Sequence, residues 1–411
     1  MMNRSASFKL AAWPCLLALA ALLCAFAARG QSPVGYPFPQ NVDYGRGTRP
    51  KNHTASQMND DCVRFYAAWL SDCVTTNGCP SGACRVDVGS YVPDILTPHD
   101  TASEGIAWGM LITALMDNQT NHAKKIFDSL NRYREAFTNA NGLMNWRISS
   151  NGVVLGPGAA TEADENMAMA LLYADKKWGS TGPTDYLRQA TNLIQAIMEK
   201  EVEPSTFVLK PGDTFGGSTL LNPCYFDTAF YRVWETVTGD SHWRRVTAAC
   251  RPVMEYFHTN YTTGLAPDWC QASGRPAGSL DYSFHYNACQ VPLKSAIDYA
   301  WFGSSNDDLA FLDNDRLVAW ICARTGGNPS LIVDGYRLDG TPTGAYPNAT
   351  AFIAPLLCAS MCSADHQAFC DKLYDKLVAL PAGRPYGYYG DTLRLACLLL
   401  ATGNMPNLWP R

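Results

Sequence analysis

Segments with helical periodicity recur along almost the whole chain, and this repetition limits the fold more than any other feature of the sequence. Apolar residues return every three or four positions within these segments, and loops rich in Gly, Pro and Asn separate them. The expected helices are residues 58–71, 103–116, 121–137, 161–178, 184–200, 225–238, 241–259, 289–302, 306–323, 349–361, 364–380 and 390–402. Strand-like alternation is weak and confined to short pieces, such as residues 152–155 and 331–333. The pattern predicts an all-α fold of about twelve helices that pair and close into a ring, rather than a sandwich or a doubly wound sheet.

The first thirty residues differ from the rest of the chain. Arg4 and Lys9 precede an apolar run over residues 10–28, and residues 25–27 (AFA) offer a small-x-small cleavage pattern. This pattern predicts a secretory signal peptide over residues 1–30 and an extracellular mature protein. An uncleaved anchor is the alternative, because the run is nearly long enough to span a bilayer. No tether or second module follows, so we expect one domain over residues 31–411 and no membrane contact once the signal is removed.

Cysteine use is high for a chain of this length. Of the fifteen cysteines, Cys15 and Cys24 fall within the predicted signal, and the thirteen others suit an oxidising compartment. Two groups crowd together, within residues 62–84 and 358–370. Zinc binding is one interpretation, but the chain has no Cys-x-x-Cys pair and only seven histidines. We therefore predict disulfides, with at least one free thiol because the count is odd, and no metal site.

Charge and loop composition indicate the kind of partner. The net charge of -5 and the absence of a basic run argue against nucleic acid and leave a neutral polymer as the better fit. Aromatic and acidic side chains gather in the connections before predicted helices; the rings are Trp146, Phe215, Trp269, Tyr286 and Tyr389. Aromatic faces stack on the C–H faces of sugars, while acids and amides bind hydroxyls. Such rings can also be core and such acids helix caps, but their recurrence before helices favours a carbohydrate-binding surface.

The stretch from residue 100 to residue 115 reads as the start of an apolar helix. Asp100 or Ser103 can cap the free amides, which places Glu104 in the first turn, where the helix dipole favours a carboxylate. Gly105, Gly109 and a tryptophan between them would leave room for a ligand beside an aromatic face. The plainer interpretation is that Glu104 is simply an acid of the first turn.

Six short motifs follow one another along the chain. They are DTASEG (100–105), GLMNW (142–146), ATEADE (160–165), LKPGD (209–213) with two glycines at 216–217, PDW (267–269) and YGDTLR (389–394). In this order they resemble glycoside hydrolase family 8. The resemblance extends from residues 36–40 (YPFPQ) to residues 403–404 (GN), so it covers nearly the whole mature chain. Each motif alone is modestly specific, whereas the ordered set is very specific.

This resemblance implies a fold and a chemistry. The fold is an (α/α)6 barrel, in agreement with the helix pattern, and the reaction is hydrolysis of β-1,4-linked glucan, xylan or chitosan with inversion at the anomeric carbon. Inversion needs two carboxyl groups about 6.5–9.5 Å apart, one protonated and one ionised, with a water between them, and it needs no cofactor or metal. Glu104 matches the family's proton donor in Thr-x-Ser-Glu-Gly. Asp164 matches the second acid of the ATEADE signature and is expected to support the sugar site or a helix start.

The general base is where the sequence departs from the family. Members of the endoglucanase type carry YDAxRxP with the aspartate as base, whereas residues 286–292 here are YNACQVP. Asn287 takes the place of that aspartate and Gln290 that of the arginine. An amide cannot take a proton from water at neutral pH, so Asn287 can only position the water. Glu162 replaces an aspartate of the family signature, and Phe215 replaces a tryptophan.

Three accounts of this departure remain open. Another acid can serve as base, and with no large insertion in the chain Glu162 and Asp281 are the local candidates. A second account is a weak or inactive relative that binds glycans, because Asn287 has replaced the base. A third is a shifted substrate with a new base geometry. We favour a secreted, monomeric hydrolase that cuts internal bonds of a cellulose-like glucan with Glu104 as its acid.

Overall fold

A computed structural model of the protein describes residues 34–90, 96–303, 309–383 and 387–409. The predicted signal peptide and the start of the segment predicted at 306–323 lie outside these residues. The described chain contains twelve α-helices, which confirms the number predicted from periodicity. They are α2 (Ala55–Cys73), α3 (Ser103–Met116), α4 (Ala123–Ala136), α5 (Thr161–Trp178), α6 (Tyr186–Lys200), α7 (Thr228–Thr238), α8 (His242–Asn260), α9 (Val291–Phe302), α10 (Leu309–Thr325), α11 (Thr350–Ser360), α12 (Gln367–Ala379) and α13 (Gly387–Ala401).

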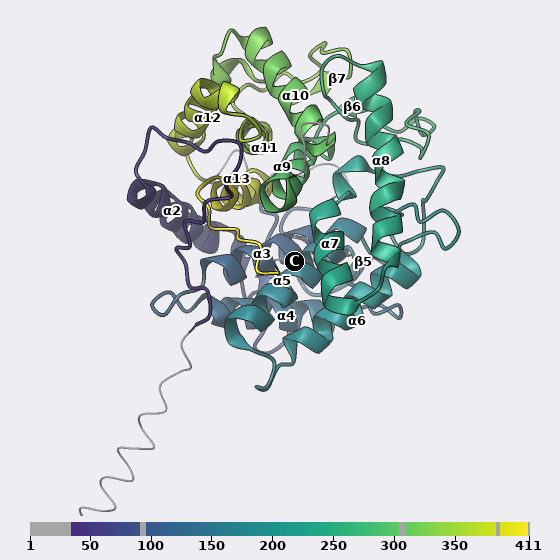
Figure 1. Cartoon of the computed structure of the whole chain (residues 1–411). Coiled ribbons are helices and arrows are strands. Elements are labelled where there is room, and N and C mark those ends of the chain that lie inside the picture. The colour runs from purple at the N-terminus through teal and green to yellow at the C-terminus, as the bar shows by residue number, and fades with distance from the viewer. Residues whose placement is uncertain (1–33, 91–95, 304–308, 384–386, 410–411) are drawn as a thin grey trace, which may run out of the picture.

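The helices form two concentric rings, as Figure 1 shows. In the inner ring α3 packs on α5, α7 on α9, α9 on α11, α11 on α13, and α13 on α3. The remaining inner pair, α5 and α7, is joined by the Tyr231 hydroxyl, which donates to Glu165 Oε1 at 2.6 Å. Each outer helix packs chiefly on one inner helix: α2 on α13, α4 on α3, α6 on α5, α8 on α7, α10 on α9 and α12 on α11; α10 also contacts α11. The predicted (α/α)6 barrel is therefore confirmed.

Residue character explains which helices lie inside. In α3 every residue except Glu104 is buried, and in α11 every residue is buried, so both are apolar on all faces. Outer helices such as α4 and α6 have one apolar and one charged face. The glycines of α3 do not leave ligand space. A Cβ on Gly105 would lie 3.1 Å from a Val86 methyl carbon, and one on Gly109 would lie 3.1 Å from the Trp69 ring, so these glycines allow close packing instead.

Short strands and 3-10 helices decorate the connections. Three antiparallel sheets occur among the described residues: β1 (Val74–Thr75) with β2 (Arg85–Val86), the order β3-β4-β5 (Thr101–Ala102, Arg147–Ile148, Val154–Gly156), and β6 (Ser283–Phe284) with β7 (Tyr336–Arg337). The register pairs Thr101 with Ile148 and Phe284 with Tyr336. The 3-10 helices are η1 (Pro223–Tyr225), η2 (Ala288–Gln290), η3 (Pro329–Leu331) and η4 (Ala364–His366). The strand predicted at 331–333 is wrong, because η3 occupies its start and Val333 makes one isolated bridge.

The segment before α2 crosses one end of the barrel, where the inner helices finish. Its backbone amides donate to carbonyls just beyond α3, α13 and α11: Phe38 to Asp117, Val42 to Gly403, and Thr48 to Met361. These bonds are 2.8–3.0 Å long. The opposite end of the barrel, where α3, α5 and α9 begin, carries the predicted site residues.

The start of α3 is not capped as predicted. Its N-cap is Ala102, and no side chain bonds the first amides. Asp100 instead accepts from Arg147 Nε at 2.7 Å and from the Thr97 amide at 2.9 Å. Ser103 is already the first helical residue, and its amide donates to the Trp146 carbonyl at 2.9 Å. Arg147 and the Thr97 amide thus engage the Asp100 carboxylate that would have formed a cap.

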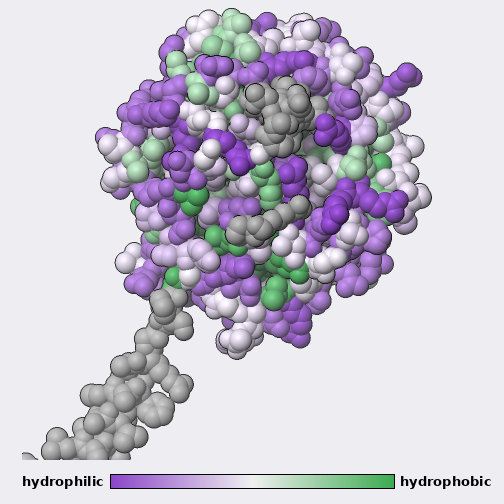
Figure 2. All heavy atoms as spheres, in the orientation of Figure 1, coloured by the Kyte–Doolittle hydropathy of each residue, from purple (hydrophilic) through white to green (hydrophobic). Residues whose placement is uncertain are grey.

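The cysteine prediction is also corrected. All thirteen cysteines of the described residues are free thiols, and eleven of them are buried. They pack as small apolar side chains against the helices, a common role for buried cysteine. No helix in the described part of the chain has the length and apolar character needed to cross a bilayer. The face in Figure 2 is largely hydrophilic, with hydrophobic residues in small scattered patches.

Candidate active site

Glu104 lies in the first turn of α3, as predicted, and is the one residue of that helix that is not fully buried. Burial raises its pKa well above the ordinary glutamate value, and the charge of Glu162 raises it further, while Lys294 lowers it. The partly enclosed carboxyl group therefore keeps its proton to higher pH than a surface glutamate. A proton donor to a leaving oxygen needs this property.

Glu162 lies in the first turn of the neighbouring helix α5 and is 4% exposed. Lys294 Nζ is 3.7 Å from its Oε1, and Gln290 Nε2 donates weakly to its Oε2 at 3.4 Å. Burial raises the pKa of Glu162, Lys294 lowers it, and Asp227 raises it. Glu104 and Glu162 thus form a pair of neighbouring carboxyl groups, and the Lys294 ammonium lies directly beside Glu162.

Lys294 was not predicted, yet it organises the charge of the site. It is 3% exposed, and its Nζ donates to Asp227 Oδ2 at 2.6 Å and lies 5.0 Å from the Trp108 ring centroid. Burial lowers its pKa, but Asp227 and Glu162 outweigh this effect, so the pKa rises and the ammonium stays charged. The signal available in the sequence was a single lysine within the apolar run that follows Pro292.

Asn287 stands at the start of η2 and is held by a second buried acid, Asp268. The Asn287 side-chain amide donates to Asp268 Oδ2 at 3.1 Å. Asp268 Oδ1 accepts from the backbone amides of His285, Asn287 and Ala288 at 3.1, 3.1 and 2.7 Å. Asp268 therefore fixes the loop. It bonds the nitrogen of the Asn287 side-chain amide and not the side-chain oxygen Oδ1, which can accept a hydrogen bond from a water. Sequence reasoning noted Asp268 only as part of the PDW motif.

Asp281, the other predicted base candidate, lies just before β6 with its side chain 48% exposed. Its Oδ1 accepts from Ser283 Oγ at 2.5 Å, and its Oδ2 is 3.8 Å from His285 Nδ1. The structure groups Asp281 with His285 and Asp268, whose ligand atoms all lie within 4.8 Å of one another. No contact joins it to Glu104 or Glu162 among the interactions of the described residues.

The predicted stacking residues are all at least partly exposed. Trp146 follows the loop from α4, Phe215 precedes η1, Trp269 and Tyr286 precede η2, and Tyr389 opens α13. Phe215 and Tyr286 are 46% and 41% exposed. The Tyr389 hydroxyl donates to the Tyr286 carbonyl and accepts from Gln290 Nε2 at 3.2 Å. Because Gln290 Nε2 also lies 3.4 Å from Glu162 Oε2, Gln290 connects the Tyr389 ring to Glu162.

Asp164 has a supporting place. It is fully buried, and its Oδ1 accepts from the Met144 amide at 3.2 Å. Burial raises its pKa to about 8, against the lowering effects of that bond and of Arg134. Its buried carboxyl group therefore stabilises the turn that carries Trp146 by accepting the Met144 amide, and it is not presented to solvent.

Comparison with known proteins adds the family context. The model of glycosyl hydrolases family 8 matches residues 56–403. The chain is 39% identical to Endoglucanase A of Acetivibrio thermocellus over 397 residues, covering 95% of this chain and 79% of that one. It is 32% identical to the Beta-glucanase of Niallia circulans, covering 98% of each chain. A solved β-1,3-1,4-glucanase from Paenibacillus sp. X4 superimposes with a TM-score of 0.82 at 30% identity, covering 91% of this chain and 99% of the other.

Proposed function

Because the chain belongs to glycosyl hydrolases family 8 and is therefore a glycoside hydrolase, we propose that it cuts internal β-1,4 bonds of a cellulose-like glucan with inversion. The proposal for a glucan rests on relatives named endoglucanase and β-glucanase that align over most of the chain. Relatives named as xylose-releasing exo-oligoxylanases are only 23–28% identical, so xylan is the less favoured substrate. Chitosan is the third candidate from the family resemblance.

Glu104 is the proposed general acid. The observation that carries this assignment is its place: a partly exposed carboxyl group at the start of an otherwise buried inner helix, beside a second carboxyl group. Its raised pKa keeps it protonated, so that it can donate a proton to the glycosidic oxygen as the bond to the anomeric carbon breaks.

Glu162 is the proposed ionised partner. Two neighbouring carboxyl groups cannot both ionise cheaply, and Lys294 lies beside Glu162, so the negative charge is favoured there and the proton on Glu104. Glu162 Oε1 is buried and accepts no hydrogen bond from the described residues, so the attacking water would have to enter the site beside it to occupy this acceptor. Asn287, oriented by Asp268, would position that water without taking its proton.

Asp281 is the second candidate for the base. Its exposed carboxylate lies on the loop that leads to Asn287, and His285 lies beside it. Asp268 is disfavoured, because its two oxygens already accept four N–H bonds. The two remaining acids are separable by experiment, because removing the true base costs about 10²–10⁴ in rate, as general acid–base catalysis is worth that much.

The test measures reducing ends released from carboxymethyl-cellulose, xylan and chitosan by the wild type and by the variants Glu104→Gln, Glu162→Gln and Asp281→Asn. We expect release from carboxymethyl-cellulose that Glu104→Gln and Glu162→Gln abolish and Asp281→Asn leaves intact. If Asp281→Asn abolished the release of reducing ends while Glu162→Gln retained it, Asp281 would be identified as the base. Binding of glucan without release by the wild type would establish the catalytically inactive, glycan-binding alternative. Proton NMR of the first anomer formed tests inversion.

Secretion and oligomeric state are further parts of the proposal. The basic start and apolar run of residues 1–30 support an exported protein whose signal peptide is cleaved. The largely hydrophilic face in Figure 2 is in keeping with a monomer. N-terminal sequencing of the protein from the culture medium and light scattering of the purified protein test these two points.

A further inference from the structure

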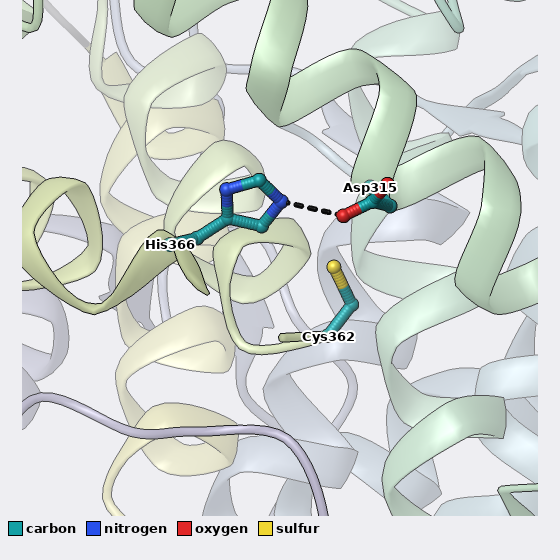
Figure 3. Close-up of side chains that lie close together, drawn as sticks. All are labelled: Asp315, Cys362 and His366. Carbon is teal, nitrogen blue, oxygen red and sulfur yellow. Dashed lines mark hydrogen bonds and ion pairs between the residues drawn. The ribbon is translucent and has the colours of Figure 1, made fainter. Parts of the chain in front are cut away.

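A second group of reactive side chains lies away from the proposed catalytic residues. Asp315 of α10, Cys362 just after α11 and His366 of η4 point toward one another in Figure 3. Their ligand atoms, a carboxylate oxygen, the sulfur and an imidazole nitrogen, all lie within 4.8 Å of one another. His366 Nε2 and Asp315 Oδ1 are 2.8 Å apart. The connection between α11 and α12 and the more distant helix α10 thus bring three different ligand types to one point.

The location separates this cluster from the sugar chemistry. Cys362 follows the last turn of α11, at the barrel end that the segment before α2 crosses, where the Thr48 amide donates to the Met361 carbonyl at 2.8 Å. Glu104 and Glu162 lie in the first turns of their helices, at the opposite end. Neither the proposed reaction nor the packing of the core uses the Asp315 carboxylate, whose side chain is 42% exposed.

The exposure of the three side chains to solvent increases from Cys362 through His366 to Asp315. Cys362 is 2% exposed, the His366 side chain 12%, and the Asp315 side chain 42%. The sulfur and the imidazole are therefore fixed by packing, while one side of the cluster opens to water. A site with three protein ligands and one open position for water has this form.

The distances suit a small tetrahedral ion. With bonds of about 2.0–2.3 Å to oxygen, nitrogen and sulfur, neighbouring ligand atoms in such a site are about 3.3–3.6 Å apart. Ligand atoms that now lie up to 4.8 Å apart would have to approach by about 1.2–1.5 Å on binding, and the half-exposed Asp315 side chain has the most room to move. The separation of 2.8 Å between His366 Nε2 and Asp315 Oδ1 would lengthen by about 0.5 Å as the metal replaces the shared hydrogen.

We propose that Asp315, Cys362 and His366 form a binding site for Zn²⁺, with a water as the fourth ligand. The ligand set favours this ion, because thiolate and imidazole are ligands that zinc takes readily, whereas Ca²⁺ and Mg²⁺ prefer oxygen alone. Cys362 and His366 are four residues apart, and Asp315 comes from α10, which contacts α11. The bound ion would therefore link α10 to the connection between α11 and α12.

The first experiment uses the full chain after treatment with a chelator and its removal by dialysis. Isothermal titration with Zn²⁺ should show binding of one ion per chain, and titration with Co²⁺ should show the near-ultraviolet charge-transfer band of a cobalt thiolate together with the visible bands of a tetrahedral ion. Cys362→Ala should abolish the charge-transfer band. His366→Ala and Asp315→Asn should each weaken the Zn²⁺ affinity by at least about 10-fold, because mutating even a residue that only hydrogen-bonds a metal ligand lowers metal affinity by about that factor.

Controls make the result decisive. Cys322→Ala removes a partly exposed thiol from the same helix as Asp315 and should leave both bands and the affinity unchanged. Asp315→Asn keeps the size of a half-exposed side chain, so it reports on the site without opening a cavity. The proposal fails if the wild type binds neither ion, or if the thiolate band survives in Cys362→Ala or disappears in Cys322→Ala. Hydrolysis of glucan by the same samples is measured separately, so a failed metal site leaves the proposed function untouched.

Discussion

Replacing Lys294 with methionine tests the charge arrangement on which the proposed reaction depends. Lys294 and its partner Asp227 are almost completely enclosed, with side chains 2% and 1% exposed, and Nζ lies 2.6 Å from Asp227 Oδ2. The same Nζ is 3.7 Å from Glu162 Oε1. Methionine keeps most of the volume of the lysine side chain, so the substitution removes the charge and its hydrogen bond with little change in packing.

The expected cost follows from the burial of the partner acids. Removing one member of a buried ion pair costs about 3–5 kcal/mol in unfolding free energy, because the other charge is left without compensation. Protonation of the carboxyl groups limits this loss. Each extra proton that the folded variant binds changes the stability by about 1.4 kcal/mol per pH unit.

The sign of the pH dependence is fixed by the direction of the pKa shifts. The pKa values of Glu104, Glu162 and Asp227 are already raised by burial in the folded protein. Between the ordinary carboxyl range and those raised values the folded chain holds more protons than the unfolded chain, so stability falls as pH rises. Without Lys294 the pKa values of Glu162 and Asp227 rise further, and the fall becomes steeper.

Urea unfolding of wild type and Lys294→Met at pH 5 and pH 8 measures this effect. We expect the larger loss at pH 8. Lys124→Met is the control at a more exposed group: Lys124 pairs with Asp128, with side chains 42% and 28% exposed, worth about 0–1 kcal/mol, and its Nζ also donates to the Tyr186 hydroxyl at 2.6 Å, worth about 1 kcal/mol. Equal losses in the two variants, or a loss in Lys294→Met that does not shrink toward pH 5, would refute the reasoning. If Glu162 is the base, the acidic limb of the kcat/KM profile of Lys294→Met should also move to higher pH.

Three further predictions follow from single groups. Asn287→Asp should leave kcat without a gain if Glu162 is the base, whereas a clear rise in kcat would show that the base was lost at position 287. Because burial and the Glu162 charge raise the pKa of Glu104, the alkaline limb of the kcat/KM profile should lie well above the ordinary glutamate range, and a limb within that range would contradict Glu104 as acid. Asp100→Ala should cost about 2 kcal/mol in chemical denaturation, because it removes two bonds of a buried carboxylate, from Arg147 Nε at 2.7 Å and from the Thr97 amide at 2.9 Å, whereas the exposed cap substitution Asp185→Ala should cost about 1 kcal/mol.

The sequence by itself determined the helices and the place of the proposed acid. Helical periodicity is local, since apolar residues three and four positions apart lie on one face, so the twelve helices could be predicted from short windows. The same pattern placed Glu104 in the first turn of a buried helix and the aromatic residues in the connections. The motif order pointed to the family, and it also showed that Asn287 had replaced the expected base.

Only the tertiary structure decided which groups meet at the helix ends. The closing of the ring brings Lys294 of α9 to Glu162 of α5, and it brings Asp268 beneath Asn287. It also leaves the described cysteines unpaired and gathers Asp315 with Cys362 and His366, although spacing alone argued for disulfides and against a metal. Such contacts depend on how helices far apart in the chain are packed, and packing is a property of the whole core that no short stretch of sequence contains.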